Sequence, residues 1–330
     1  MTNLEQRIKL LSKLGEYMNG DAPSWLDAKE LAVRQNSWFT LEYVEIAVQH
    51  IVEGYLREGL LRSWISQYKL PAVPKTVGIV MAGNIPLVGF HDFLCGFISG
   101  HNLKLKLSSR DAALMKDILR LLIEWEPAVA EQVVVGDLIK DCDAYIATGS
   151  NNSSRYFEQY FAKWPHIIRK NRTSVAVLDG SETEEELQEL AKDVFTYFGL
   201  GCRNITQVQV PEGYDFLRLL NVFQNHADLM NHHKYHNNYD YHLAVYLLNK
   251  VPYMTNESLL MVENEIPFSA VSVLHYQYYK DQDEVIVRLK NNDDIQAVIG
   301  HKAISFGDAQ RPELSDYADG VDTMAFLCGL

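Results

Sequence analysis

The feature of this sequence that most constrains its fold is a change in hydrophobic periodicity after residue 75. Residues 3–70 have a helical pattern throughout, and from residue 76 onward short apolar runs such as Val77–Met81 alternate with helical patterns. Short continuous apolar runs are typical of strands that are buried on both faces of a parallel sheet. Their alternation with helices indicates a doubly wound α/β fold.

The alternation occurs in two blocks, which predict two domains. The first block ends near residue 172, and the second opens with Ser174–Leu178. Strands are predicted at 77–81, 103–107, 132–135, 144–147, 174–178, 205–210, 259–262, 271–276 and 295–299. We therefore expect two Rossmann-like doubly wound domains, residues 1–172 and 173–330, with a helical N-terminal segment in the first.

Charge and cysteine content narrow the class of protein. The 330 residues include 30 Lys and Arg against 43 Asp and Glu, a net charge of −13, whereas surfaces that bind nucleic acid are basic. The four cysteines lie far apart and form no C-x-x-C pair. The N-terminus has no signal-peptide pattern, and no apolar run approaches the length of a membrane span. We expect a cytoplasmic protein with free thiols, no nucleic-acid partner and no membrane span.

Three short motifs follow predicted strands of the first domain. They are Asn84-Ile85-Pro86, Lys106-Leu107-Ser108 and Thr148-Gly149-Ser150. In open α/β sheets, ligands bind beyond the carboxyl ends of the strands, where these motifs are predicted to lie. Each motif also has a purely structural interpretation: a turn before proline, a lysine that protects an edge strand, and a helix cap.

A cysteine lies in a glycine-containing loop of the second domain. In the stretch Phe198–Asn204, Gly199 and Gly201 precede Cys202, and a β-branched run follows from Ile205. Glycines let the backbone bend tightly and leave the sulfur uncrowded, as a nucleophile that attacks a carbonyl carbon requires. The alternative is a cysteine that packs as a small hydrophobic residue.

In their order and spacing, these motifs resemble the aldehyde dehydrogenase superfamily, and more closely its acyl-CoA reductase branch, which includes the fatty-acid reductase of bacterial luminescence. The resemblance runs from about Val77 to past Val262. It implies an aldehyde dehydrogenase-like fold, with an NAD(P)-binding domain at 1–172 and a catalytic domain at 173–330.

The resemblance also implies roles for single residues. Cys202 would be the nucleophile that forms a thioester, and the Asn84 amide with the Cys202 backbone N–H would hold the developing oxyanion. Lys106 and Ser108 would contact the adenosine ribose. Thr148-Gly149-Ser150 would lie close to the pyrophosphate, since a helix N-terminus favours anions.

Cofactor preference follows from the residues after Lys106-Leu107-Ser108. Relatives that prefer NAD often carry an acidic residue there, which binds the ribose 2′-hydroxyl, whereas this chain has Ser109 and Arg110. A cation in place of a carboxylate accommodates a 2′-phosphate. We therefore expect NADPH rather than NADH.

One departure from the family indicates the type of reaction. Hydrolytic aldehyde dehydrogenases have a glutamate that activates water, and the aligned position here holds Arg169. A guanidinium cannot accept a proton from water near neutral pH. The expected reaction is therefore exchange of an acyl group with coenzyme A and reduction of acyl-CoA to aldehyde. An acyl-phosphate reductase and a non-catalytic nucleotide-binding relative are the alternatives, and an acyl-donating partner protein is left open.

Two further segments stand out by their composition, one rich in histidine and asparagine and the other at the C-terminal end of the sequence. Five histidines lie among asparagines in residues 225–242, and His232 and His236 have the i,i+4 spacing of a helical metal site. The asparagines favour a polar loop without metal, and a lining of the acyl or CoA channel is the third possibility. The tail, residues 307–327, becomes apolar at its end. Such a tail would dock on a partner in a homo-oligomer, which we expect, or on its own domain.

Overall fold

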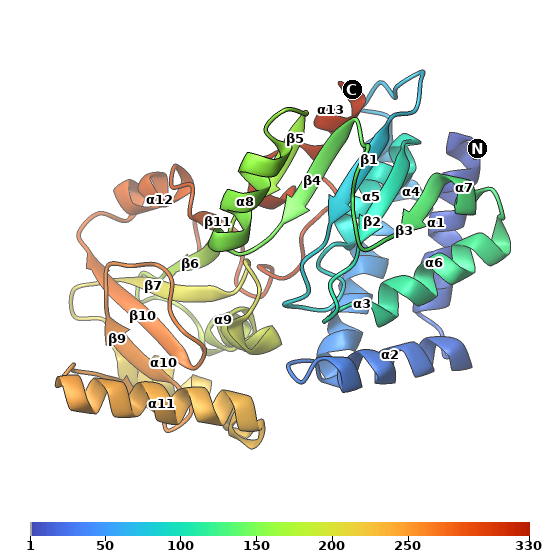
Figure 1. Ribbon diagram of the computed structural model, residues 1–330. Helices are drawn as coiled ribbons and strands as arrows, with labels where there is room; N and C mark the ends of the chain where they lie inside the picture. Colours follow the sequence, from blue (N-terminus) through green and yellow to red (C-terminus); the bar gives the residue numbers. More distant parts are fainter. Residues whose placement is uncertain (1) are drawn as a thin grey trace. The chain divides into compact units, whose positions relative to one another are not determined.

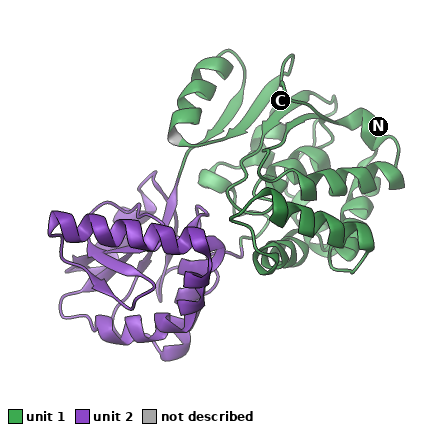
Figure 2. Ribbon diagram, turned by 60° about the horizontal axis from the view of Figure 1, so that its bottom comes forward, with its two compact units in different colours: residues 1–171, 312–330 green, residues 172–311 purple. Residues whose placement is uncertain are grey.

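The computed structural model describes residues 2–330 and divides the chain into two compact units, drawn in different colours in Figure 2. The first unit comprises the chain up to Asn171 together with Pro312–Leu330, and the second comprises Arg172–Arg311. The first boundary lies next to the expected one at residue 172. The tail differs from expectation, because residues 312–330 fold with the first unit and not with the second.

Four helices form the N-terminal segment of the first unit. They are α1 (Leu4–Met18), α2 (Pro23–Gln35), α3 (Leu41–Tyr55) and α4 (Glu58–Ile65). Asn3 and Gln6 form a reciprocal capping box at the start of α1, and Thr40 caps α3 through the N–H of Tyr43. These caps satisfy backbone donors that have no partner within the helix. The helical N-terminal segment is confirmed.

The sheet of the first unit contains five parallel strands in the order β3-β2-β1-β4-β5. The strands are β1 (Thr76–Val80), β2 (Asn102–Lys106), β3 (Val133–Val135), β4 (Ala144–Thr148) and β5 (His166–Arg169). The connecting helices are α5 (Phe90–Ser99), α6 (Ala113–Trp125), α7 (Val129–Gln132) and α8 (Asn151–Phe161). Because β1 pairs with both β2 and β4, the loops after these three strands lie at the same edge of the sheet (Figure 1).

The second unit has its own sheet, in the order β11-β6-β7-β10-β9-β8, and every pairing is parallel except that of β8 with β9. The strands are β6 (Thr173–Val177), β7 (Ile205–Pro211), β8 (Met254–Thr255), β9 (Leu260–Glu263), β10 (Val273–Tyr279) and β11 (Ile295–Ile299). The helices are α9 (Glu184–Phe195), η1 (Thr196–Gly199), α10 (Phe216–Phe223), η2 (Gln224–Asn231), α11 (His233–Asn249) and α12 (Gln282–Lys290).

The C-terminal tail packs on the first unit, where η3 (Ala318–Gly320) is followed by α13 (Thr323–Cys328). Leu327 has no exposed surface. Its carbonyl oxygen accepts from Nε2 of His101, and Asp322 accepts from the Tyr68 hydroxyl at 2.9 Å. The tail therefore docks within the same chain, but on the first unit and not on the domain of residues 173–330 to which it was expected to belong. Oligomer contact remains a prediction.

The two-domain α/β fold class is confirmed, and one local interpretation is wrong. Residues 233–249 form the regular helix α11 and not the polar loop that the asparagines suggested. His232 caps this helix by accepting from the N–H of Tyr235. Two of the four tyrosines of this helix, Tyr235 and Tyr239, are buried and anchor it to the unit, so tertiary packing outweighs the weak helix propensity of asparagine. Within residues 2–330, no helix is both long and apolar enough to cross a bilayer.

Candidate active site

In the first unit, the loop after β1 carries Asn84, whose side chain is exposed. Two side chains, those of Asn36 and Asp111, hold this loop through hydrogen bonds to its backbone. Asn36 Nδ2 donates to the carbonyl oxygen of Gly83 at 3.3 Å, and Asp111 Oδ2 accepts from the N–H of Leu87 at 2.8 Å. Leu87 has a positive φ of 56°, a conformation that needs such support.

Asp111 is the residue of this loop region that sequence reasoning missed. It is 5% exposed, and its Oδ1 has no hydrogen-bond partner. Burial raises its pKa well above the ordinary range for a carboxyl group, although hydrogen bonds from Leu87 and Val88 oppose the shift. The Asp111 carboxyl group therefore anchors the loop, and its burial favours the neutral form. The signal in the sequence was only an aspartate just after the Lys106–Arg110 motif.

The loop after β2 places Lys106 and Arg110 in solvent and leaves Ser108 half-buried. The Ser108 hydroxyl accepts from the N–H of Arg110 at 3.3 Å. A Cβ atom on Gly83 would lie 2.4 Å from the Ser108 hydroxyl oxygen. Only glycine lets the loops after β1 and β2 approach this closely.

The loop after β4 leads directly into α8. The Ser150 hydroxyl caps the helix by accepting from the N–H of Ser153 at 3.3 Å. A Cβ atom on Gly149 would lie 2.8 Å from that of Ser153, so glycine is needed here as well. Thr148, the last residue of β4, is half-buried. A capped helix N-terminus beyond a parallel strand is an anion-binding arrangement.

The donor set of the first unit fits a dinucleotide. Lysine, arginine and serine side chains at the end of β2 suit a ribose or its phosphate, and the start of α8 suits a pyrophosphate. The end of β2 and the start of α8 both lie at the edge of the sheet that carries the Asn84 loop. The predicted cofactor residues are thus brought together in one unit.

In the second unit, Cys202 is half-buried and lies between α9 and β7. Its carbonyl oxygen accepts from the Ser174 hydroxyl at 3.1 Å. By contrast, Cys95 and Cys142 are buried, and burial raises the pKa of both thiols. A partly accessible thiol in a compact turn has the placement that a nucleophile needs.

The position of Arg169 changes the interpretation of this residue. It is 2% exposed, its guanidinium lies 2.6 Å from a carboxylate oxygen of Asp92, and it donates to the Thr323 hydroxyl at 2.8 Å. The Arg169 side chain thus lies in the interior of the first unit, where its contacts with Asp92 and Thr323 join β5, α5 and α13. A glutamate-type base is still missing at this position, but the arginine that replaces it is structural.

Histidines of both units make local contacts. His166, the first residue of β5, has its Nδ1 2.8 Å from the carbonyl oxygen of Trp164. The ring of His232 packs on that of Phe198, with the ring centroids 4.3 Å apart. The ring of His226 packs on that of Phe195, with the centroids 5.1 Å apart. These histidines therefore pack beside the loop that leads to Cys202.

Among residues 2–330, a grouping with metal-ligand chemistry occurs elsewhere, at Asp179, Glu182 and His301. His301 Nδ1 is 2.9 Å from Asp179, and its Nε2 is 3.1 Å from Glu186. Hydrogen bonding to Asp179 raises the pKa of His301, so these groups form an ion-paired cluster. The cluster follows the carboxyl ends of β6 and β11, whereas Cys202 precedes the amino end of β7.

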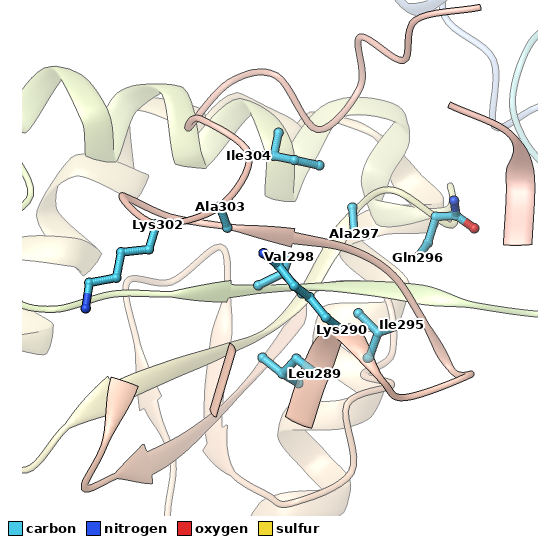
Figure 3. A pocket seen from close by; sticks show the side chains of 9 residues that line it. All are labelled: Leu289, Lys290, Ile295, Gln296, Ala297, Val298, Lys302, Ala303 and Ile304. Carbon is cyan, nitrogen blue, oxygen red and sulfur yellow. The ribbon is translucent and has the colours of Figure 1, made fainter. Parts of the chain in front are cut away.

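A separate open pocket of about 460 Å³ lies along the edge strand β11 (Figure 3). Its lining comes from α12, β11 and the segment that follows β11. Lys290 and Lys302 are part of this lining, together with apolar residues such as Ile304. The predicted site residues are not among its lining residues, so this pocket is distinct from the candidate site.

Solved structures with the same fold are aldehyde dehydrogenases and related enzymes. Aldehyde dehydrogenase 21 from Physcomitrella patens, in complex with succinate, superposes with a TM-score of 0.70 at 11% identity, over 91% of this chain and 74% of the plant protein. An oxidoreductase from Marinobacter aquaeolei superposes with a TM-score of 0.69 at 12% identity, over 90% of this chain and 73% of the oxidoreductase. An NAD⁺ complex of aldehyde dehydrogenase from Bacillus cereus superposes with a TM-score of 0.66 at 13% identity, over 90% of this chain and 72% of the dehydrogenase. The fold is that of the aldehyde dehydrogenase superfamily.

The family within this superfamily comes from the sequence. Residues 56–213 match the family described as acyl-CoA reductase (LuxC). This segment contains Asn84, the motifs at 106–110 and 148–150, and Cys202. No curated protein matches the chain. This segment therefore resembles the acyl-CoA reductase (LuxC) family, as the motifs predicted, and the fold of the chain is that of aldehyde dehydrogenases.

Proposed function

We propose that this protein reduces an acyl-CoA, or a similar acyl thioester, to an aldehyde with NAD(P)H. The observation that carries the proposal is the LuxC match over residues 56–213, because this one segment includes Cys202 as well as the dinucleotide-binding loops. The partial exposure of Cys202 and its place in a compact turn support the role of nucleophile.

The reaction begins at the sulfur of Cys202. Its thiolate attacks the thioester carbonyl carbon, the Cys202–acyl bond forms, and coenzyme A leaves as a thiolate. The Asn84 amide and the backbone N–H of Cys202 stabilise the oxyanion in this step. Lys106, Ser108, Arg110 and the start of α8 would hold NAD(P)H, which would supply a hydride for reduction of the thioester. With a proton, this reduction gives the aldehyde and returns the Cys202 thiol.

Two features of the first unit support the choice of cofactor and acceptor. Arg110 is exposed beside the half-buried Ser108, so a cation is available for a 2′-phosphate and favours NADPH. Arg169 is paired with Asp92 inside the unit, so it supplies no base to activate water. The thioester on Cys202 is therefore transferred or reduced faster than it is hydrolysed.

The test is acylation of the purified protein by acyl-CoA esters without reductant. We expect the intact mass to rise by one acyl group in the wild type and not in Cys202→Ser, and subsequent NADPH to release aldehyde. Cys142→Ser is the matched control, because that thiol is buried and should leave acylation unchanged. Acylation of both variants to the wild-type level would overturn the role of Cys202. Modification by acyl phosphates alone would favour the acyl-phosphate reductase.

Cofactor choice is tested by substitution at one site. Arg110→Ala should lower kcat/KM for NADPH by about tenfold and leave kcat/KM for NADH within about twofold, because only the 2′-phosphate needs the cation. Equal losses with both cofactors, or a wild type that prefers NADH, would contradict the preference for NADPH.

A further inference from the structure

We infer that Asn204 is a positioning residue for Cys202: its side-chain amide fastens the turn that carries the cysteine to the end of helix α9. Asn204 has no exposed surface, although Cys202, two residues earlier, is partly accessible. The inference rests on the proposed function, because a fixed turn serves catalysis only if Cys202 attacks a substrate.

The first part of the argument concerns the end of α9, which terminates at Phe195. The last carbonyl groups of a helix have no partner within it. Asn204 Nδ2 donates to the carbonyl oxygens of Asp193 at 3.0 Å, Val194 at 3.3 Å and Thr196 at 2.8 Å. One side-chain amide therefore caps the helix and binds the loop to it.

The second part concerns the turn itself. The N–H of Gly201 donates to Asn204 Oδ1 at 2.8 Å, and the N–H of Asn204 donates to the Gly201 carbonyl oxygen at 3.1 Å. These two bonds close a four-residue turn that has Cys202 and Arg203 at its centre. The Ser174 hydroxyl holds the Cys202 carbonyl oxygen from the neighbouring strand. The main chain of Cys202 is thus held on both sides.

The third part concerns the segment between the helix and the turn. Tyr197 and Phe198 both have φ of 55°, and Gly199 follows with 76°. Aromatic residues adopt this left-handed conformation only where the surroundings impose it. The two rings are buried, and that of Phe198 packs on His232. Aromatic packing therefore fixes the start of the loop, and Asn204 fixes its end.

Orientation of this turn matters for the chemistry proposed. The backbone N–H of Cys202 is one of the two proposed oxyanion donors, and its direction is set by the turn that Asn204 closes. Displacements of about 1 Å at a reacting centre cost on the order of 100-fold in rate. Loss of the Asn204 amide should therefore lower acyl transfer more than it lowers the reactivity of the thiol itself.

The experiment compares three variants by two independent readouts. Asn204→Ala removes every side-chain bond, whereas Asn204→Ser keeps an oxygen for the Gly201 N–H and loses the Nδ2 donors. Asn256→Ala is the control: its side chain also closes a turn in the second unit, by accepting from the N–H of Leu259 and donating to the Leu220 carbonyl oxygen. The readouts are hydrogen exchange of residues 196–206, and Cys202 acylation by acyl-CoA against alkylation by iodoacetamide.

We expect Asn204→Ala to lower the maximal acylation rate by at least tenfold, with the concentration of acyl-CoA at half-maximal rate and the alkylation rate both within about threefold of wild type. Exchange in residues 196–206 should rise at least tenfold. The acylation rate and the exchange rate of Asn204→Ser should lie between those of the wild type and of Asn204→Ala. The serine variant replaces the alanine variant if the latter does not fold. Asn256→Ala should leave the acylation rate unchanged.

The outcomes separate the two proposals. Acylation of Asn204→Ala, or of Asn204→Ser in its place, at a near wild-type rate would overturn the positioning role, and so would unchanged exchange in residues 196–206. An equal loss of acylation in Asn256→Ala would reduce the effect to general destabilisation and would also overturn it. A wild type that iodoacetamide alkylates at Cys202 but acyl-CoA does not acylate would refute the proposed function, whatever the exchange data show.

Discussion

At the scale of single residues, Asp111 shows how a neutral carboxyl group supports the candidate site. It is buried, one of its oxygens accepts from the loop that carries Asn84, and the other has no partner. Burial raises its pKa well above the ordinary value, which favours the neutral form of the carboxyl group. In that form the group binds the loop without placing a charge in the interior.

This description predicts a difference between two substitutions of Asp111. Asp111→Asn keeps a neutral group with an acceptor oxygen, so the free energy of unfolding should change by less than about 1 kcal/mol. Asp111→Ala leaves the N–H groups of Leu87 and Val88 without this acceptor, and the loss should be about 2–4 kcal/mol. Tryptophan fluorescence in urea measures the first unit selectively, because Trp25, Trp38, Trp64, Trp125 and Trp164, all five tryptophans, lie in it. Equal losses in both variants would show that the carboxylate form is required.

At the scale of secondary-structure elements, the pair of Arg169 and Asp92 joins three of them. Arg169 ends β5, Asp92 lies in the first turn of α5, and Thr323 begins α13. The two charged side chains are 3% and 10% exposed. A buried pair stabilises little in total, but removal of one partner leaves an uncompensated charge.

Arg169→Met should therefore lower the free energy of unfolding of the first unit by about 3–5 kcal/mol. The double variant Arg169→Met with Asp92→Leu should recover most of this loss, because neither charge is then left unpaired. Urea unfolding followed by tryptophan fluorescence checks both. Hydrogen exchange of residues 318–330 shows whether the C-terminal tail is released in the single variant. A loss below about 1 kcal/mol would mean that the pair is solvated.

At the scale of the whole molecule, single buried groups in the two units should respond to pH in opposite directions. In the second unit, burial raises the pKa of Asp193 to about 7 from an ordinary 3.8, and the nearby charges of Asp308 and Glu189 add to the shift. The folded unit thus keeps a proton that the unfolded chain loses between pH 4 and 7. Its free energy of unfolding falls as pH rises through this window, by at most about 1.4 kcal/mol per pH unit from this group.

Two histidines extend the contrast. Hydrogen bonds that His301 donates to Asp179 and Glu186 raise the pKa of this histidine in the second unit, so its stabilising effect is full below about pH 6.5 and is lost as pH rises through the raised value. In the first unit, burial lowers the pKa of His101, which bonds to Leu327 in the tail. The unfolded chain then binds this proton first, and the stabilising effect of His101 is lost as pH falls below about 6.5.

We therefore expect Asp193 to make the second unit more stable as pH falls from 7 to 6, and His101 to make the first unit less stable as pH falls below about 6.5. Hydrogen exchange, corrected for intrinsic rates and analysed by peptide, measures both units in one experiment. Asp193→Asn should change the pH response of the second unit and leave that of the first unchanged. The same pH response of the second unit in Asp193→Asn and in the wild type would contradict the assignment of Asp193.

Much of the fold could be predicted from local patterns. The strand predicted at 295–299 coincides with β11, and the predicted run at 205–210 lies within β7, because buried parallel strands are continuous apolar segments. The start of α11, residues 233–238, could not be predicted in this way, since it depends on the packing of Tyr235, which is buried only in the folded unit. The tail was ambiguous for the same reason, because its partners His101 and Tyr68 are distant in sequence.

The sequence by itself determined the class of fold, the family resemblance and the residue types available for chemistry, because periodicity and motif spacing are local properties. Only the tertiary structure decided what surrounds those residues: the pairing of Arg169 with Asp92, the neutral Asp111 beneath the Asn84 loop, and the Asn204 amide that closes the Cys202 turn. The physical reason is that burial and hydrogen-bond partners arise from segments far apart in the chain, so their effect on charge and position exists only after folding.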